Sequence, residues 1–159
     1  MLRNTMLFAH PVCTLLSLSS QASVFTTISW HTCALVSSSL TTPQASRAFA
    51  TTALSTAGLI PPTHLLTADD CTFGKPHPEP YLKGAALLSA DIKNCLVIED
   101  APAGIRSGVS AGARVLAVCT SHERSKLEGL GAVAVVRDLS GVEVQWAGDG
   151  RMRVVVREG

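Results

Sequence analysis

Two short apolar runs in the second half of the chain indicate its architecture. Residues 95–98 are continuously apolar and are followed at once by the acids Glu99 and Asp100. Residues 114–118 form a second run, apolar after its first residue. Runs of this length without polar alternation are typical of strands buried on both faces of a parallel sheet. We therefore predict two such strands, the first ending in carboxylates at the carboxyl edge of the sheet, where open α/β folds bind their ligands.

The stretch between these runs has the pattern of a helix packed against the sheet. Pro102 suits the first turn of a helix, where its missing N–H needs no partner. Apolar residues recur at every fourth position, and so do glycines that let the backbone lie close to the strands: Ala101, Ile105 and Val109 in the first series, Gly104, Gly108 and Gly112 in the second. We predict a helix that ends at Gly112 and connects the two strands as a parallel crossover.

Strands and helices alternate along most of the remaining chain. The patterns predict strands at residues 31–36, 65–67 and 132–136, helices at 43–56, 81–88 and 123–128, and a terminal hairpin of residues 142–146 and 152–156. Thr42 and Ser121 are the expected N-caps of the first and last of these helices. This alternation is typical of an α/β protein with a mostly parallel sheet, followed here by a C-terminal β-hairpin.

Charge is distributed very unevenly along the 159 residues. No aspartate, glutamate or lysine precedes Asp69, and residues 1–29 are rich in serine and threonine. We expect residues 1–29 to be a poorly structured leader unrelated to the fold, and residues 30–159 to form a single domain. The apolar patch behind Arg3 and the lack of acids leave a secretory signal or an organelle transit peptide as alternatives. Without such targeting, we expect a cytoplasmic protein.

The composition argues against several classes of partner. A net charge of +1 and the lack of a basic run argue against nucleic acid. No apolar run reaches the ~18 residues that a membrane-spanning helix needs. The five cysteines, an odd number without C-x-x-C spacing, favour reduced thiols over a disulfide framework. We expect a monomer whose partner is a small molecule.

The adjacent acids Glu99 and Asp100 are the first candidates for chemistry. Two neighbouring carboxylates raise each other's pKa unless a cation lies nearby. A hard cation with oxygen ligands, such as Mg²⁺, would satisfy both, so the pair predicts a magnesium site. The alternative is that Asp100 is only the N-cap of the helix that follows, a position that aspartate favours.

The loop of residues 67–81 carries the second candidate, Lys75. This lysine lies between Gly74 and Pro76, and two further prolines follow within five residues. A backbone so restricted by proline would hold Lys75 in one place. The alternative is an ordinary exposed loop lysine. His77 and Glu79, which lie between the prolines, are expected to be solvated rather than ligands.

These two segments carry a family resemblance. The sequence GKPHPEPYLKGA, followed by LVIEDAPAGIRSGVSAGA, resembles the haloacid dehalogenase-like hydrolases, above all fungal phosphatases acting on 2-deoxyglucose 6-phosphate, glycerol phosphates and related small esters. The likeness covers residues 30–159, including TSHERSKLEGLGA. It implies a three-layer α/β sandwich with a Rossmann-like parallel sheet and Mg²⁺-dependent hydrolysis of small sugar or polyol phosphate monoesters.

The resemblance also implies roles for individual residues. Lys75 matches the lysine that neutralises the phosphoryl group, and Asp100 matches the acid that binds Mg²⁺. Glu99 would lie at the metal site or be the partner of the lysine. Ser37 or Ser38 would donate a hydroxyl to a phosphate oxygen from the end of the second strand. A cation, a lysine and hydroxyl donors together stabilise the negative charge of a phosphoryl transition state.

One family motif has no counterpart. The family carries D-x-D-x-T on a first strand, whose first aspartate is the nucleophile, but no acid precedes Asp69, and Asp69-Asp70-Cys71-Thr72 has the wrong spacing. That strand lies in the family between the counterparts of residues 31–36 and 95–98, so we expect a gap in the sheet. Residues 23–30 are the only β-prone run upstream that could enter this empty strand position. The helical cap that follows the motif is also missing.

Two classes of function follow. The chain resembles the C-terminal part of a phosphatase, joined to an unrelated leader or produced from a misplaced start, and is expected to be inactive alone. The alternative is a non-catalytic remnant that binds phosphate or metal. A receiver domain of similar topology would also need an acid at an earlier strand end, which this sequence lacks.

Overall fold

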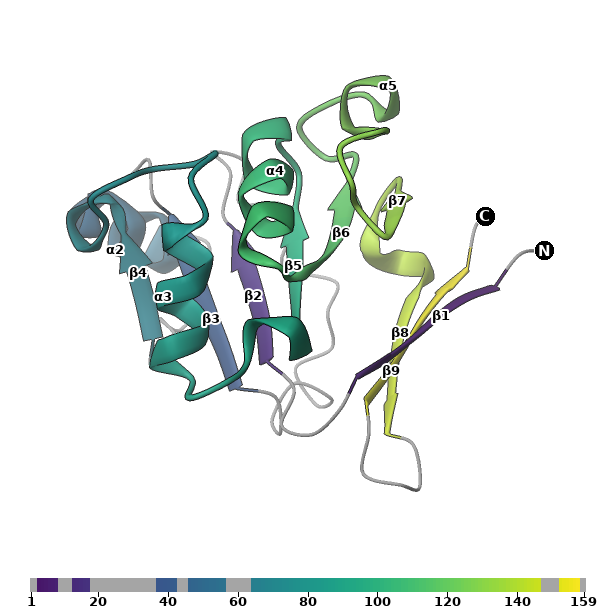
Figure 1. Cartoon of the computed structure of the whole chain (residues 1–159). Coiled ribbons are helices and arrows are strands. Elements are labelled where there is room, and N and C mark those ends of the chain that lie inside the picture. Colours follow the sequence, from purple (N-terminus) through teal and green to yellow (C-terminus); the bar gives the residue numbers. More distant parts are fainter. Residues whose placement is uncertain are drawn as a thin grey trace.

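A parallel sheet forms the centre of the protein. The computed structural model describes residues 3–8, 13–17, 37–42, 46–56, 64–146 and 152–157. A six-stranded parallel sheet has the order β4-β3-β2-β5-β6-β7, and a three-stranded antiparallel sheet has the order β1-β9-β8 (Figure 1). The strands are β1 Arg3–Phe8, β2 Cys13–Ser17, β3 Ser37–Thr42, β4 His64–Thr67, β5 Cys95–Glu99, β6 Arg114–Val118, β7 Ala134–Val136, β8 Val142–Trp146 and β9 Met152–Arg157.

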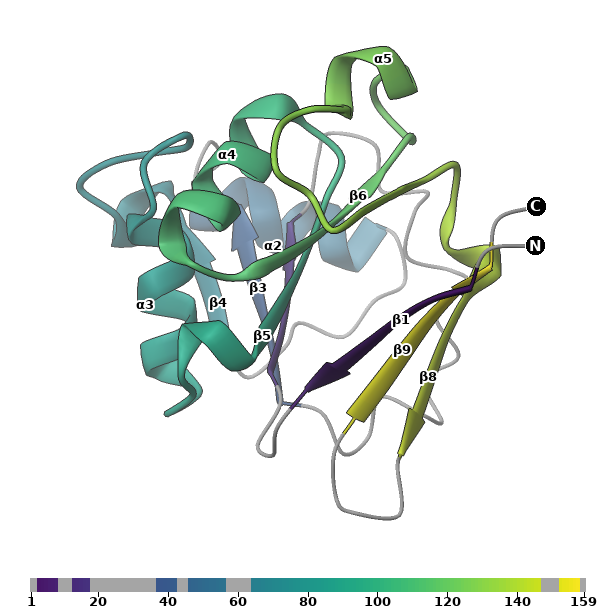
Figure 2. The same ribbon diagram turned by 45° about the vertical axis from the view of Figure 1, so that its right-hand side comes forward.

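Helices cover the parallel sheet on both faces, which makes the three-layer α/β arrangement that was predicted. Helices α3 (Glu79–Leu87) and α4 (Pro102–Ala111) lie on one face, and α2 (Arg47–Thr56) lies on the other (Figures 1 and 2). The short helix α5 (Arg124–Leu127) follows β6, and single 3-10 turns span Ala68–Asp70, Ile92–Asn94 and Leu139–Gly141. None of the helices described is long and apolar enough to cross a membrane.

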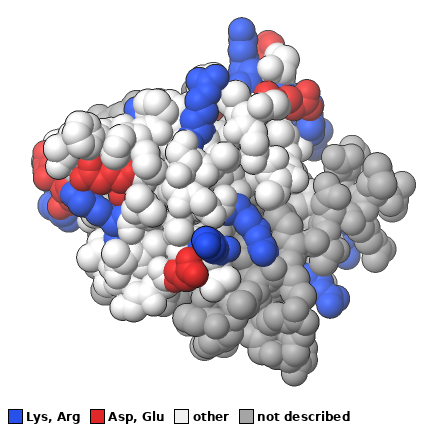
Figure 3. All heavy atoms as spheres, viewed as in Figure 1, with Lys and Arg blue, Asp and Glu red and all other residues white. Residues whose placement is uncertain are grey.

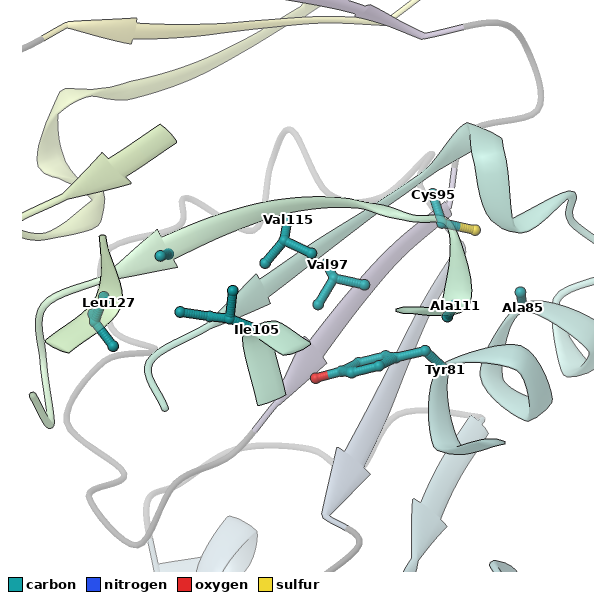
Figure 4. Packing of buried hydrophobic residues seen from close by; sticks show 9 residues of the cluster. Tyr81, Ala85, Cys95, Val97, Ile105, Ala111, Val115 and Leu127 are labelled. Carbon is teal, nitrogen blue, oxygen red and sulfur yellow. The ribbon is translucent and has the colours of Figure 1, made fainter. Parts of the chain in front are cut away.

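Strands β5 and β6 are buried on both faces, as their apolar runs predicted. Alternate residues of the two strands point to opposite sides and form two core clusters. The first cluster unites Val97, Val115 and Ala117 with Tyr81 of α3 and Ile105 of α4 (Figure 4). The second unites Leu96, Leu116 and Val118 with Val154 and Val156 of β9. The small antiparallel sheet therefore covers part of the face opposite α3 and α4.

The centre of the parallel sheet has no gap. Strand β2 lies between β3 and β5, with Cys13 level with Ser37 on one side and with Cys95 on the other. The expected gap is therefore wrong, and so is the expectation that residues 1–29 are poorly structured throughout, since β1 and β2 lie within them. Without β2, the facing edges of β3 and β5 would leave backbone N–H and C=O groups unpaired. The short run of β2 pairs with both edges. The run considered for this position, residues 23–30, lies outside the described residues.

The helix after β3 begins later than predicted. Strand β3 spans Ser37–Thr42, and the predicted strand at residues 31–36 lies outside the described residues. Thr42 is the last residue of β3 rather than a helix cap, and α2 begins at Arg47. The propensity of a residue for strands depends strongly on its neighbours in the sheet, so pairing with β2 and β4 determines where this strand lies.

The C-terminal hairpin is confirmed. Strands β8 and β9 pair antiparallel from Val142↔Val156 to Trp146↔Met152. Strand β1 pairs with the other edge of β9, from Arg3↔Arg157 to Phe8↔Met152, which the sequence did not predict. The first strand of the chain is therefore an edge strand of the terminal sheet.

One cysteine departs from the expectation of reduced thiols. Cys95, which is fully buried, is disulfide-bonded, whereas Cys71 and Cys119 are free. The expectation is therefore wrong for Cys95, because an odd number of cysteines prevents complete pairing but not a single bond. Burial raises the pKa of the Cys71 thiol above its ordinary value.

Gly112 provides a test of how α4 ends. Its φ of 88° lies in the left-handed region, and a methyl group there would meet no atom within 4 Å. The cost of Gly112→Ala is therefore conformational, and we expect the free energy of unfolding to fall by about 1–2 kcal/mol. Gly112→Asn should lose less, because asparagine adopts this conformation more readily. Urea unfolding measures both, and an alanine variant as stable as the parent would contradict the assignment.

Candidate functional site

Three segments meet at the carboxyl edge of the parallel sheet. Strand β5 ends there in Glu99, followed by Asp100, and strand β6 is followed there by Thr120 and Ser121. The loop between β4 and α3 brings Lys75 to the same edge. The edge therefore collects a lysine, two acids and two hydroxyls from distant parts of the sequence.

Lys75 and Glu99 form a buried ion pair. The lysine side chain is 7% exposed and the glutamate side chain 1% exposed. The Tyr81 hydroxyl donates to the same oxygen, Oε1, that accepts from Lys75 Nζ. The other oxygen, Oε2, accepts from the backbone N–H groups of Asp100 (3.1 Å) and Ala101 (3.4 Å). Of the two predicted roles for Glu99, the geometry favours partner of the lysine.

The approach of α4 makes room for this carboxylate. A methyl group on Gly104 would overlap the Glu99 carboxyl group, so only glycine fits at this position of the helix. The Ser107 hydroxyl, one turn further along α4, donates to the His77 carbonyl at 2.6 Å. His77 belongs to the loop of residues 67–81 that carries Lys75, called the lysine loop below. Helix α4 therefore supports both members of the ion pair.

Asp100 faces the turn after β6. Its Oδ2 atom accepts from the Thr120 hydroxyl at 3.3 Å and from the Ser121 hydroxyl. His122 Nδ1 lies 3.0 Å from the Asp100 carbonyl oxygen. The N-cap of α4 is Ala101, so the alternative that Asp100 only caps this helix is wrong. Asp100 itself is 6% exposed.

Glu79 folds back to hold the lysine loop. Its carboxylate accepts from the N–H groups of Thr72 (3.0 Å) and Phe73 (2.8 Å) and forms a 2.6 Å ion pair with Lys83. The hydrogen bond from Lys83, followed by that from Thr72, lowers the pKa of Glu79 to about 2. The loop is thus fixed by hydrogen bonds as well as by its prolines, and Glu79 is not the purely solvated residue that was expected.

Arg47 ties the outer end of the loop to α2. Its guanidinium contacts both carboxylate oxygens of Asp70 at 2.9 and 2.7 Å, and Asp70 also accepts from the Thr67 hydroxyl at 2.8 Å. Partial burial pulls the pKa of Asp70 upward, but the Thr67 hydrogen bonds and Arg47 outweigh it, so the pKa is lowered. Figure 3 shows acidic and basic side chains intermixed at the edge where this loop lies.

Only Asp100 fits a metal ion among the predicted ligands. The described part of the chain contains no group of three or more histidine, cysteine, aspartate or glutamate side chains placed to hold one. Both oxygens of Glu99 accept hydrogen bonds from protein donors, whereas the hydroxyls of Thr120 and Ser121 both donate to one oxygen of the buried Asp100 side chain, Oδ2. Mg²⁺ often binds through one or two carboxylates, waters and a substrate phosphate, and Asp100 fits that mode.

The predicted serines do not reach this edge. Ser37 is level with Cys95, so Ser37 and Ser38 lie at the amino end of β3. Four residues further along, roughly 13 Å in a strand, Thr41 and Thr42 reach the carboxyl edge, where Thr42 pairs with Thr67. The predicted position of the serines at the strand end is therefore wrong.

The structure adds residues that sequence reasoning did not assign. Tyr81 contacts Glu99, and Thr120 and Ser121 contact Asp100. Their signal was available only as family likeness, because Tyr81 ends the PEPY segment and the other two open TSHERSKLEGLGA.

Known proteins share this part of the chain. Glycerol-1-phosphate phosphohydrolase 2 of Saccharomyces cerevisiae is 36% identical over 94 residues, which cover 55% of this chain and 38% of that protein. The yeast 2-deoxyglucose-6-phosphate phosphatase 2 is 37% identical over 90 residues, 52% of this chain and 37% of that protein. The chain thus spans less than two fifths of the length of these relatives.

A solved structure shares the fold. The haloacid dehalogenase family hydrolase from Deinococcus radiodurans, with bound phosphate and sodium, superimposes with a TM-score of 0.59 at 26% identity, over 67% of this chain and 49% of that one. The family model of the haloacid dehalogenase-like hydrolases matches residues 33–112, which are 80 of the chain's 159 residues and include Lys75, Glu99 and Asp100. The chain therefore belongs to the haloacid dehalogenase-like hydrolases.

Proposed function

We propose that these residues are the lysine and metal-binding half of a Mg²⁺-dependent phosphatase site for small sugar or polyol phosphate monoesters. The observation that carries the proposal is the buried Lys75–Glu99 ion pair beside Asp100 at the carboxyl edge of the sheet. The substrates named for the two yeast relatives, glycerol 1-phosphate and 2-deoxyglucose 6-phosphate, support the class of ester.

Each residue has a role that follows from its charge and support. Lys75 offers an ammonium group to the phosphoryl oxygens, and its ion pair with Glu99 keeps this group in place. Asp100, held by Thr120 and Ser121, would be the carboxylate that binds Mg²⁺. The ion supplies positive charge that draws electrons from the phosphoryl group. Fixed charges of this kind stabilise a phosphoryl transition state without reorganising during the reaction.

The attacking group is the part that the 159 residues do not supply. Phosphoryl transfer in the family uses an aspartate oxygen, and no acid precedes Asp69. Asp69 accepts from the Arg47 N–H at 3.0 Å, and Asp70 is engaged by Thr67 and Arg47. Neither is placed beside Lys75 and Asp100 by any of these contacts. We therefore propose that these residues alone bind phosphate without turning over an ester.

The second candidate function is a non-catalytic module that binds phosphate or metal. The same observation favours it, because Lys75 needs no nucleophile to retain an anion and Asp100 needs none to bind a metal ion. The two candidates share one binding site and differ in whether that site is one half of a catalytic site.

Binding of inorganic phosphate tests the site. We expect calorimetry to detect phosphate binding that is strengthened by Mg²⁺. Lys75→Ala should weaken it about tenfold or more, because an ammonium contact to phosphate is charge-assisted. Asp100→Asn should remove the effect of Mg²⁺. Lys93→Ala, an exposed lysine at the opposite end of β5, is the matched control.

Two results would contradict this proposal. Equal heats of binding for the parent and Asp100→Asn with Mg²⁺ would show that Asp100 does not bind the metal ion. Phosphate binding that is unchanged in Lys75→Ala would show that Lys75 does not bind the anion.

Turnover tests whether these residues carry a nucleophile of their own. We expect no hydrolysis of 2-deoxyglucose 6-phosphate, glycerol phosphate or p-nitrophenyl phosphate above that of Lys75→Ala with Mg²⁺ present, because an oxygen nucleophile in line with the leaving group is required. Phosphate release in a coupled assay is the measurement. Activity that Lys75→Ala abolishes would show that another group of this chain attacks the phosphorus.

A further inference from the structure

We propose that Tyr81 is a positioning residue that fixes the ammonium group of Lys75 for phosphate. The inference rests on the proposed function, since it gives Lys75 a binding role. Tyr81 does not touch the phosphate; it acts through Lys75 and through the carboxylate of Glu99.

Tyr81 contacts both members of the ion pair. Its hydroxyl donates to Glu99 Oε1, the oxygen that also accepts from Lys75 Nζ. Its ring lies beneath the ammonium group, with Nζ 5.4 Å from the ring centroid. A cation at this distance is attracted to the electron-rich face of an aromatic ring. One side chain therefore restrains Lys75 through its hydroxyl and its ring.

The backbone fixes Tyr81 itself. It occupies the third position of α3, which begins at Glu79, and its side chain is fully buried in the cluster with Val97 and Ile105. Figure 4 shows the ring beside these residues, with the hydroxyl directed away from Cys95, along the direction of β5. Since Glu79 also holds the lysine loop at Thr72 and Phe73, one end of α3 fixes both the backbone and the ammonium of Lys75.

Packing alone does not account for the hydroxyl. Phenylalanine would fill the same space in the core, and burial of a hydroxyl is costly unless it is hydrogen-bonded. Here the hydroxyl is directed at the most buried carboxylate of the site. A carboxylate that accepts two hydrogen bonds on one oxygen has less freedom to rotate. The ammonium group of Lys75 is therefore fixed in orientation as well as in position.

The experiment compares two substitutions at Tyr81. Tyr81→Phe removes the hydroxyl and keeps the ring, whereas Tyr81→Leu removes both. Leu116→Ala, in the core cluster on the opposite face, serves as a control that destabilises the fold without touching Lys75. The first readout is the rate of acetylation of Lys75 relative to exposed Lys93 in the same sample, followed by peptide mass spectrometry. The second is the dissociation constant of inorganic phosphate from calorimetry.

We expect Tyr81→Phe to raise the Lys75 to Lys93 labelling ratio and to weaken phosphate binding, each by about tenfold, as for loss of a hydrogen bond to a charged group. Tyr81→Leu should show a larger change in both, and Leu116→Ala should leave the ratio unchanged. An unchanged ratio in Tyr81→Phe, or an equal rise in Leu116→Ala, would overturn the proposal. If the parent protein binds no phosphate, the proposed function fails, while the labelling ratio still decides whether Tyr81 fixes Lys75.

Discussion

The arrangement of side chains at the carboxyl edge of the sheet depends on the buried ion pair of Lys75 and Glu99. Removing two charges from water costs several kcal/mol per ion, and only close geometry with further hydrogen bonds offsets that cost. The structure supplies these bonds from the hydroxyl of Tyr81 on α3 and from the N–H groups of Asp100 and Ala101, and Gly104 on α4 leaves the space that the carboxylate fills. Loss of any one of these bonds would leave a buried charge with fewer partners.

The same ion pair separates the roles of the two adjacent acids. Glu99 turns toward the lysine and the start of α4, so its oxygens are occupied by protein donors. Asp100 turns toward the hydroxyls after β6. The sequence alone suggested that both carboxylates face one cation. In the structure they point to different partners. The arrangement leaves one acid to hold the lysine and one for the metal ion that we propose.

The central strands, the helix between them and the terminal hairpin could be predicted, because each depends on a local pattern. Burial on both faces gives β5 and β6 their apolar runs, and the positive φ of Gly112 marks the end of α4. Strands β2 and β3 could not be predicted in place. The short apolar run of β2 was assigned to a leader, and the serine and threonine residues of β3 take their structure from strand pairing. For the same reason Ser37 was assigned to the wrong end of its strand. Tyr81 and Ser121 were missed because their importance comes from contacts 18 and 21 residues away in sequence.

A double-mutant cycle on the ion pair tests this account most directly. The free energy of unfolding would be measured for the parent, Lys75→Met, Glu99→Gln and the double variant. The account predicts that each single variant loses about 3–5 kcal/mol, because it leaves an unpaired buried charge. The double variant should lose less than the sum of the two by about 2 kcal/mol or more. Losses that add within about 0.5 kcal/mol would mean that the two charges are not coupled, and would contradict the central role given to this pair.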